Sequence, residues 1–227
     1  MDGSEKNSVT CQYINKIRYE EALQIQEDAH QKIKLSEPKT AGYLFLLEHY
    51  PVITNGRFGN DENFVFPVSQ IEKLGIEVYK SERGGDLTYH GPGQLVAYPV
   101  IDLRAFNLGV KAYIVSLEQV LINLLSDFGI NSCRREGYPG VWTNAQKIAS
   151  IGVSVKNGIT MHGSALNVST DLDSFSLIVP CGISDVQVTS MERVLDTQVL
   201  MEDVVESFIR HFKIVLNTSV NKENGPV

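Results

Sequence analysis

Two β-patterned runs joined by an Asn-Gly dipeptide constrain the fold of this 227-residue chain more than any other local feature. The runs cover residues 147–155 and 159–168, with Asn157-Gly158 between them. Both central residues of a type I′ turn need a positive φ, which asparagine and glycine adopt at low cost, so the dipeptide predicts a β-hairpin with a two-residue turn. In that register Val153 faces His162, and simple alternation places Lys147 on the same face as both.

The other periodic patterns predict where helices and strands lie. Apolar residues at steps of three and four indicate helices over 17–35, 110–128 and about 198–215. Short apolar runs indicate strands over 42–48, 76–80 and 95–101. Grouped strands with helices at the ends and in the middle predict an α+β fold: a single domain over 1–227 with a mixed β-sheet and flanking helices. The polar termini, about 1–12 and 217–227, are expected to lie outside the core, and the C-terminal one is expected to fray.

Charge and composition exclude several classes of partner. A net charge of −7 argues against nucleic acid as the main partner, because phosphate binding needs a positive face. No apolar run approaches the roughly 20 residues that span a bilayer, and the polar residues 1–10 do not resemble a secretory signal. Three cysteines, Cys11, Cys133 and Cys181, form an odd and sparse set that indicates free thiols. We therefore expect a cytoplasmic protein without membrane or nucleic-acid partners.

A glycine-rich segment, residues 83–94, predicts a ligand-binding loop. It reads Arg-Gly-Gly-Asp-Leu-Thr-Tyr-His-Gly-Pro-Gly-Gln and lies between two predicted strands. Glycines let a backbone approach a ligand closely, so this many residues of special geometry in one loop favour such a role. The segment matches neither the dinucleotide-binding fingerprint nor the nucleotide phosphate loop. It therefore predicts a different kind of acyl or nucleotide site.

Four side chains could supply the chemistry of such a site. Cys181 lies between a proline and a glycine at a chain corner, and Lys147 opens a predicted strand. Each also has a plain structural interpretation, because a lone cysteine is commonly a small buried hydrophobe and a strand-end lysine commonly reaches solvent. His90 and His162 each precede a glycine, where a histidine either donates to a bound carbonyl or completes a loop. The spacings match no familiar zinc pattern, so we expect no metal.

Cys181 and Lys147, taken together, suit acyl transfer from a thioester to an amine. A thiolate is a far better nucleophile than a thiol, and a neighbouring ammonium lowers the thiol pKa from about 8.5. Exchanging one thioester for another has little thermodynamic cost, and the lysine, once neutral, can take a proton from an incoming amine. A hydrolase built from Cys181, His90 or His162 and an acidic partner such as Asp86 is an alternative, with water as the acceptor.

Five sequence blocks resemble the lipoyl(octanoyl) transferase family in order and spacing, and the resemblance covers the chain from about residue 15 to 215. They are Arg83-Gly84-Gly85 with Thr88-Tyr89-His90-Gly91-Pro92-Gly93-Gln94, Pro139-Gly140-Val141-Trp142, Lys147-Ile148-Ala149-Ser150-Ile151-Gly152, His162-Gly163 with Ala165-Leu166-Asn167-Val168, and Pro180-Cys181-Gly182. The resemblance implies the fold shared by biotin and lipoate protein ligases, an α+β domain around a mixed sheet.

The resemblance also implies a reaction and its partners. Such enzymes move an octanoyl group from octanoyl-acyl carrier protein to a lysine on the lipoyl domain of a 2-oxoacid dehydrogenase or on the glycine-cleavage H protein. They require no metal, nucleotide or organic cofactor. Carrier protein is typically acidic, as this chain is, so docking would need a local basic patch. The candidates for that patch are Arg57, Arg83, Lys111, Arg134, Arg135 and Lys156.

Residue roles follow from the same resemblance. It implies Cys181 as the nucleophile that carries the acyl group and Lys147 as the partner that lowers its pKa. The implied acyl-binding surface consists of Arg83, Gly84, Gly85, Asp86, Leu87, Thr88, Tyr89, His90, Ser150, Ile151, Gly152, His162, Gly163, Ser164 and Ala165. Glycine and alanine suit such a surface, because an alkyl chain needs the backbone to come close without side chains filling the slot.

Two further alternatives differ in what they require of Cys181. An ATP-dependent lipoate or biotin protein ligase activates a free acid as an adenylate, so it needs no cysteine nucleophile, and its own glycine-rich strings are absent here. A non-catalytic module that binds acyl groups or lipoyl domains needs neither Cys181 nor Lys147. A transferase uses both residues.

Overall fold

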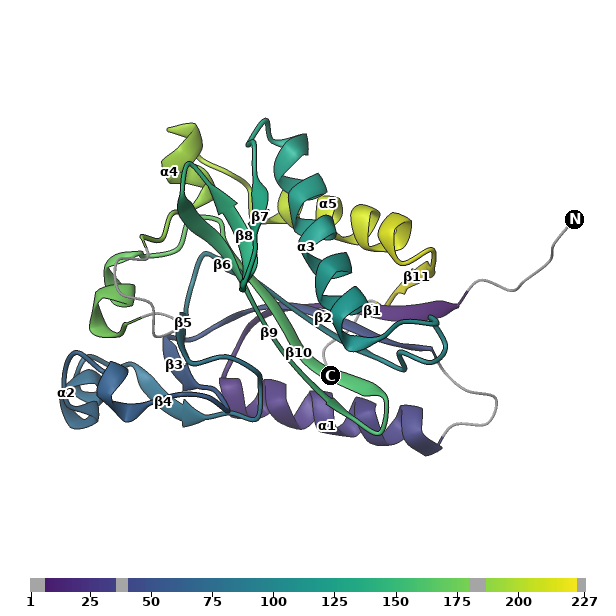
Figure 1. Cartoon of the computed structure of the whole chain (residues 1–227), viewed down its shortest axis with the longest axis horizontal. Coiled ribbons are helices and arrows are strands. Elements are labelled where there is room, and N and C mark those ends of the chain that lie inside the picture. Colours follow the sequence, from purple (N-terminus) through teal and green to yellow (C-terminus); the bar gives the residue numbers. More distant parts are fainter. Residues whose placement is uncertain (1–6, 36–40, 180–186, 224–227) are drawn as a thin grey trace, which may run out of the picture.

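A mixed sheet of eight strands forms the centre of the molecule (Figure 1). The computed structural model describes residues 7–35, 41–179 and 187–223. The strand order is β11-β1-β2-β6-β10-β9-β8-β7, in which β1 runs parallel to both neighbours and the other pairs are antiparallel. The strands are β1 (Ser8–Ile17), β2 (Gly42–His49), β6 (Gln94–Ile101), β7 (Cys133–Arg135), β8 (Tyr138–Thr143), β9 (Gln146–Lys156), β10 (Ile159–Asn167) and β11 (Ser219–Lys222).

A smaller sheet of three strands lies beside the large one, at the lower left of Figure 1. Its order is β4-β3-β5. A separate cluster of buried side chains, which includes Ile53, Ile71, Tyr89 and Phe175, holds this sheet against its short helices. The elements are β3 (Val52–Asn55), β4 (Glu77–Lys80), β5 (Leu87–His90), α2 (Val68–Lys73) and the 3-10 turns η1 (Asp61–Asn63) and η2 (Asp173–Leu177).

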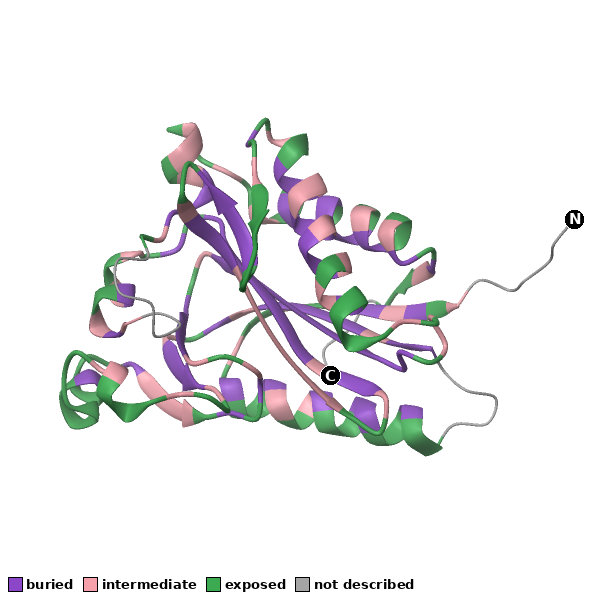
Figure 2. Cartoon of the chain, viewed as in Figure 1, coloured by how far each residue is buried: buried purple, intermediate pink, exposed green. Residues whose placement is uncertain are grey.

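The helices cover both faces of the large sheet (Figure 1). α1 (Tyr19–Leu35) lies on one face, and α3 (Val110–Asp127) and α5 (Met201–Val215) lie on the other, while α4 (Met191–Leu195) is a short helix before α5. Each long helix turns its buried residues toward the sheet, and its charged residues are exposed except for the buried Glu118 of α3 (Figure 2). Among the described residues, no helix combines the length and the apolar character needed to cross a bilayer.

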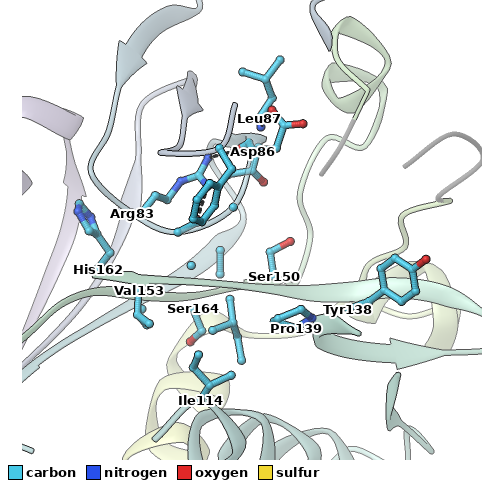
Figure 3. A pocket seen from close by; sticks show the side chains of 18 of the residues that line it. Arg83, Asp86, Leu87, Ile114, Tyr138, Pro139, Ser150, Val153, His162 and Ser164 are labelled. Carbon is cyan, nitrogen blue, oxygen red and sulfur yellow. Dashed lines mark hydrogen bonds between the residues drawn. The ribbon is translucent and has the colours of Figure 1, made fainter. Parts of the chain in front are cut away.

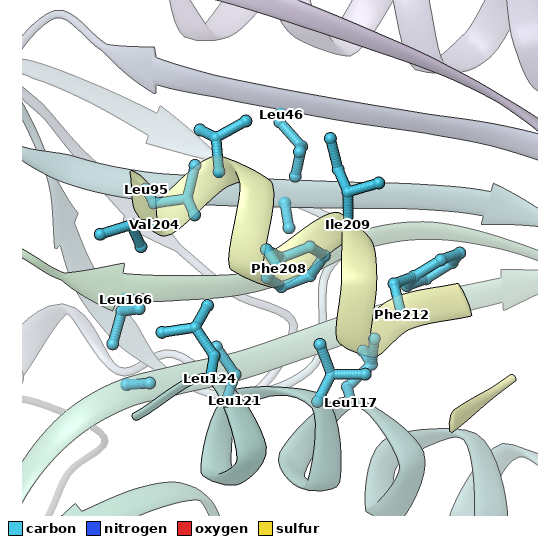
Figure 4. Packing of buried hydrophobic residues seen from close by; sticks show 14 of the residues in the cluster. Leu46, Leu95, Leu117, Leu121, Leu124, Leu166, Val204, Phe208, Ile209 and Phe212 are labelled. Carbon is cyan, nitrogen blue, oxygen red and sulfur yellow. The ribbon is translucent and has the colours of Figure 1, made fainter. Parts of the chain in front are cut away.

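The main core lies between the sheet and the pair α3 and α5 (Figure 4). Leu117, Leu121 and Leu124 form the stripe of α3, spaced as the sequence predicts, and each is at most 1% exposed. Phe208 and Phe212 of α5 stack at 6.2 Å between ring centroids beside them. Burying one such side chain contributes about 1.5–3 kcal/mol, so this layer fixes the sheet that carries the site.

The predicted helices and strands are confirmed within a few residues, and both ends of the chain differ from the prediction. Residues 8–17, which the sequence analysis placed partly in a polar terminus, form β1. The C-terminal segment predicted to fray instead forms β11, which pairs with β1 from Ser8↔Ser219 to Cys11↔Lys222. Both strands carry polar side chains on their exposed positions, so neither shows a strong apolar pattern.

The predicted hairpin is confirmed in turn and in register. Asn157 and Gly158 have φ values of 57° and 81°, as a type I′ turn requires. Lys156 pairs with Ile159, and Val153 pairs with His162. The turn therefore fixes the register of β9 against β10 over the part of the sheet that carries the candidate site.

Candidate active site

A pocket of about 420 Å³ opens beside β9 and beneath the glycine-rich segment (Figure 3). β8 pairs with β9 only as far as Gly140↔Ser150, so residues 151–153 of β9 have no β8 partner and line the pocket. Of the predicted acyl-binding residues, the pocket brings together Arg83, Gly84, Gly85, Asp86, Leu87, Thr88, His90, Ser150, Ile151, Gly152, His162, Gly163, Ser164 and Ala165, and Lys147 with them. Tyr89 lies elsewhere, because its ring packs edge-on against Phe175 in the core of the small sheet.

The glycine-rich loop is held on both sides by backbone hydrogen bonds. The Phe58 N–H donates to the Gly85 carbonyl at 3.1 Å, and the Gly84 N–H donates to the Val153 carbonyl at 2.9 Å. These approaches require glycine at two positions. A Cβ at Gly56 would lie 2.4 Å from the Gly85 oxygen, and a Cβ at Gly152 would lie 2.8 Å from the Gly84 oxygen. These close approaches are between protein segments at the pocket wall, and the approach of the loop glycines to a ligand stays a prediction.

Arg83 is buried inside this loop and organises it. The side chain is 7% exposed, and its Nη2 donates to the backbone oxygens of Thr54 at 2.6 Å and Asp86 at 2.7 Å. Its Nε donates to the Thr54 hydroxyl at 2.9 Å. A buried guanidinium satisfied in this way cross-links the loop to β3. Arg83 is therefore a poor member of the predicted basic docking patch, because a docking residue must be exposed.

Three buried histidines lie at the inner end of the pocket and stay neutral at neutral pH. Burial lowers the pKa of His49 to about 4 and that of His162 to about 4. Burial also holds the pKa of His90 well below 6.5, and positive charge on His49 and Arg83 acts in the same direction. The His49 and His90 rings pack edge-on with 5.7 Å between their centroids, and the Tyr98 ring contacts both His49 and His162. A histidine with so low a pKa is a weak general base, which disfavours the hydrolase alternative based on His90 or His162.

His162 has unusual backbone geometry. Its φ is 59°, a left-handed value that is uncommon for residues other than glycine and asparagine. Its N–H donates to the Gln26 side-chain oxygen of α1 at 2.7 Å, which offsets part of the conformational cost. The Nδ1 atom is buried, and no hydrogen-bond partner is found for it among the described residues.

Lys147 reaches the pocket because β9 contains a bulge. Val141 pairs with Ala149 and Trp142 pairs with Lys147, so Ile148 is an extra residue in the ladder. Side chains that face each other across a ladder project to the same side, so the bulge turns Lys147 away from the face that alternation predicts. The expectation that Lys147 shares the face of Val153 is therefore wrong. The bulge leaves Ile148 and Ala149 in the core with Val141, while Lys147 lines the pocket.

Gly140 and Trp142 hold the Lys147 side chain in place. Lys147 is 5% exposed, and its Nζ lies 5.6 Å from the centroid of the buried Trp142 ring, within the range of a cation–π interaction. Gly140 has a φ of 132°, and a Cβ there would lie 2.8 Å from the Lys147 Cε. Arg135 lies over the same Trp142 ring at 5.1 Å. The strand-end lysine that could simply have reached solvent is thus a buried cation in a shaped slot.

Cys181 lies outside the described residues, with Pro180 and Gly182. The chain is described again from Gln187, and there it runs beside Lys147. The Lys147 N–H donates to the Gln187 carbonyl at 2.8 Å, and the Thr189 N–H donates to the Lys147 carbonyl at 2.9 Å. The segment that follows the predicted nucleophile in sequence is therefore bonded to the backbone of its predicted partner.

Several pocket residues were missed by the sequence analysis. Phe58 is 76% exposed at the pocket, while Tyr98 is 3% exposed and its OH donates to His49 Nε2 at 2.9 Å. Tyr138 and Pro139 line it from β8, and Ile114 lines it from α3. Only Pro139 had a signal in the sequence, since it opens one of the five blocks. The others come from separate elements and have no local pattern.

Cys11 and Cys133 lie away from this pocket. Burial raises the pKa of Cys11 to about 12, so that thiol stays protonated in β1. Cys133 is exposed on β7. Within the described ranges, no cluster of three or more His, Cys, Asp or Glu side chains is placed to hold a metal ion.

Comparison with known proteins defines the class of this domain. Residues 18–213 match the family model of the lipoyl protein ligase A/B catalytic domain. The bi-partite lipoate protein ligase from Thermoplasma acidophilum is 18% identical and has a TM-score of 0.75, over 96% of this chain and 88% of that one. A biotin protein ligase from Aquifex aeolicus solved with biotin and ATP is 11% identical, with a TM-score of 0.55 over 92% of this chain and 70% of that one. The predicted fold, α+β around a mixed sheet as in biotin and lipoate protein ligases, is confirmed.

Sequence identity then separates transferases from ligases within this class. An octanoyltransferase of Caldicellulosiruptor saccharolyticus is 45% identical over 202 residues, which are 88% of this chain and 85% of that protein. The chain belongs to the octanoyltransferases, a family of acyltransferases within the lipoyl protein ligase A/B catalytic domain family.

Proposed function

We propose that the chain transfers an octanoyl group from acyl carrier protein to a lysine of a lipoyl domain, with Cys181 as the acylated nucleophile and Lys147 as its partner. The observation that carries the proposal is Lys147 itself. A bulge, a glycine and an indole ring combine to place this cation, 5% exposed, in the wall of the pocket. Few lysines are buried to this degree, and three separate features direct this one into the pocket, so the arrangement favours a catalytic role.

The reaction proceeds in two acyl transfers that balance in atoms and protons. In the first, the Cys181 thiolate attacks the carbonyl of the carrier-protein thioester, a new S–C bond forms, and the phosphopantetheine thiolate leaves and takes a proton from Lys147. In the second, the acceptor lysine amine attacks the acyl-enzyme, the N–C bond forms and the Cys181 thiolate leaves. Lys147 takes the proton that the amine loses, which restores the starting pair.

The pocket wall suits a narrow alkyl group. β9 and β10 contribute Ser150, Gly152, Gly163 and Ala165, which have small side chains or none, to the pocket wall beside the glycine-rich loop. The inner end is formed by neutral rings, which cost little to place against an apolar chain. We assign these residues, with Arg83 to His90 apart from Tyr89, to binding of the acyl group.

Docking of the acidic carrier protein would use cations at the pocket mouth. Arg57 is exposed beside Phe58, and Arg135 is exposed on β7 beside Tyr138. Arg134 is less suited, because its Nε donates to the buried Glu118 carboxylate at 3.0 Å and ties β7 to α3. Charge reversal of Arg57 and Arg135 should raise KM for carrier protein and reduce its salt dependence. Unchanged KM and unchanged salt dependence would remove this pair from the interface.

Intact-protein mass spectrometry after mixing with octanoyl-loaded carrier protein tests the proposal. The wild type should gain one octanoyl group that hydroxylamine removes, and Cys181→Ser should not gain a hydroxylamine-labile group. Added lipoyl domain should then receive the octanoyl group on a lysine without ATP. If only ATP and free octanoate lead to modification, the chain is a ligase and the role of Cys181 is wrong. Release of free octanoate in the absence of an acceptor would instead support a thioesterase.

A further inference from the structure

A line of buried polar side chains crosses the molecule beside the pocket, and only His90 of this line belongs to the acyl-binding surface proposed above. It runs from Thr54 of the small sheet through His90, Gln94 and Asn167 to Thr189, and all five residues are at most 7% exposed. His90 Nδ1 lies 2.7 Å from the Gln94 side-chain oxygen, and the Gln94 amide donates to Asn167 Oδ1 at 2.9 Å. The Asn167 amide donates to the Thr189 carbonyl at 3.0 Å.

The Thr189 carbonyl, the last acceptor of the line, fixes the direction of the hydrogen bonds among Asn167, Gln94 and His90. A backbone carbonyl only accepts, so Asn167 must present its NH₂ to Thr189 and its oxygen to Gln94. Gln94 then presents its NH₂ to Asn167 and its oxygen to His90, which makes His90 Nδ1 the donor. The same Gln94 NH₂ also donates to the Tyr89 carbonyl at 3.2 Å, which fixes its orientation a second time. Reversing one amide would therefore break bonds on both of its sides.

The two ends of the line are bonded to two parts of the site whose relative position matters for acyl transfer. These parts are the glycine-rich loop and the backbone of Lys147. At one end, the Thr54 hydroxyl accepts from Arg83 Nε and lies 3.5 Å from His90 Nε2, which ties the line to the glycine-rich loop. At the other end, the Thr189 N–H donates to the Lys147 carbonyl. The segment between Gln187 and Thr189 is bonded to Lys147 on both sides of that residue. The line thus joins the acyl-binding loop to the backbone that carries Lys147.

We propose that Gln94 and Asn167 are positioning residues for acyl transfer, which set the acyl-binding loop at a fixed distance from Lys147 and the segment 187–189. This inference rests on the proposed function, because it gives Lys147 a catalytic role. A misplacement of about 1 Å can lower a rate by about 100-fold, so a cross-strand amide pair far from any reacting atom can still control the rate. The two residues are direct partners in the β6–β10 ladder, which makes the pair rigid.

Asn167→Asp tests this inference with minimal change of shape. The carboxylate can still accept from Gln94, but it cannot donate to the Thr189 carbonyl, so the octanoyl-transfer kcat should fall by about tenfold or more at about pH 8. KM for lipoyl domain should change by less than about twofold, because both residues are buried and neither lines the pocket. Protonation of the new carboxyl restores a donor, so the ratio of variant to wild-type kcat should rise as the pH falls to about 6.

Two further variants separate positioning from damage to the fold. Gln94→Glu keeps the acceptor for His90 and loses the donor to Asn167, so it should reproduce the loss in kcat. Asn123→Asp makes the same chemical change on α3, where the amide oxygen accepts from Gln119 at 2.7 Å, and it should keep wild-type kcat. Thermal unfolding is measured for each variant.

The outcomes distinguish this inference from the proposed function. If wild-type protein transfers octanoate and a folded Asn167→Asp variant has the same kcat at every pH, the inference is wrong. The inference is also wrong if two results occur together in both Asn167→Asp and Gln94→Glu. These are a kcat that does not recover at lower pH and a loss of kcat in proportion to the loss of thermal stability, because together they would indicate damage to the fold alone. If the wild type itself transfers no octanoyl group, the proposed function fails first.

Discussion

The two ends of the β9–β10 hairpin follow different rules. At the turn end, Asn157 and Gly158 adopt the positive φ values that their residue types favour, and the strand pairs are regular. At the pocket end, Ile148 is bulged out of the β8–β9 ladder, and His162 has a left-handed φ of 59° that a histidine adopts rarely. One hairpin therefore contains a locally favoured half and a locally unfavourable half.

The difference indicates which half serves the fold and which serves the site. Regular pairing near the turn needs no help from distant residues. The bulge and the His162 geometry are maintained by other elements, through β8 and through the Gln26 side chain of α1. Irregular backbone that the surroundings must maintain is a common feature of functional sites, because it aims a side chain where regular pairing cannot.

The largest effect is expected from the two lysines of β9. Lys147→Ala removes the buried cation of the pocket, and loss of a proton-transfer group should lower kcat about 1000-fold. Lys156→Ala removes an exposed lysine next to the turn of the same strand and should leave kcat within about twofold. Single-turnover octanoyl transfer to a lipoyl domain measures both. Equal losses in the two variants would show that the pocket end has no special role.

Gly140→Ala should have the next largest effect, because it presses on Lys147 without removing it. The new Cβ would lie 2.5 Å from the Ala149 oxygen and 2.8 Å from the Lys147 Cε, at a φ of 132°. Displacing the Lys147 amine by about 1 Å should lower kcat about 100-fold. Gly129→Ala is the matched control, because its φ of 76° is also left-handed, a Cβ there meets no atom within 4 Å, and the residue does not line the pocket. A similar loss of kcat in Gly129→Ala would mean that backbone strain, and not contact with Lys147, is responsible.

The buried histidines should make stability depend on pH. The pKa values of His49 and His162 are about 4 in the folded protein and 6.5 in an unperturbed chain, so the unfolded chain binds protons first as the pH falls. The free energy of unfolding is therefore full above about pH 6.5 and falls by about 1.4 kcal/mol per pH unit for each histidine toward about pH 4.

Urea unfolding at a series of pH values measures this slope. His162→Asn keeps a residue that tolerates the left-handed backbone and removes one titrating group. The slope of its unfolding free energy against pH should therefore be shallower than that of the wild type by about 1.4 kcal/mol per pH unit. Identical slopes in the two proteins would show that His162 does not bind fewer protons in the folded state.

Sequence patterns predicted the regular parts of the structure because those parts depend on nearby residues. The Asn-Gly turn, the strand register and the apolar stripe of α3 are each specified within about one element. β1 and β11 were missed because their exposed polar positions mask the alternation, and their pairing joins residues from opposite ends of the chain. Pairing of that kind has no local signal.

The candidate site was predictable in its glycine-rich loop and not in its irregularities. The composition of residues 83–94 indicated the loop. Of its residues 83–90, which were predicted to bind the acyl group, all except Tyr89 line the pocket, whereas residues 91–94 do not. The bulge at Ile148 depends on how β8 pairs with β9 and on the segment after residue 186, which a reading of alternation along β9 alone does not contain. Tyr98 looks like an ordinary strand residue, and only the contact between its OH and His49 shows its place at the inner end.

Gly158→Ala should have the smallest effect and should change stability alone. The residue has a φ of 81°, so an added Cβ should lower the free energy of unfolding by about 1–2 kcal/mol. The nearest atom to that Cβ would be the Arg104 Nε at 3.0 Å, on a flexible side chain that can move aside. Gly158 is not among the pocket residues, so kcat should stay at the wild-type value at temperatures where the variant is folded. A large fall in kcat without unfolding would mean that strain at the turn reaches Lys147 along β9, and the two halves of the hairpin would then be one mechanical unit.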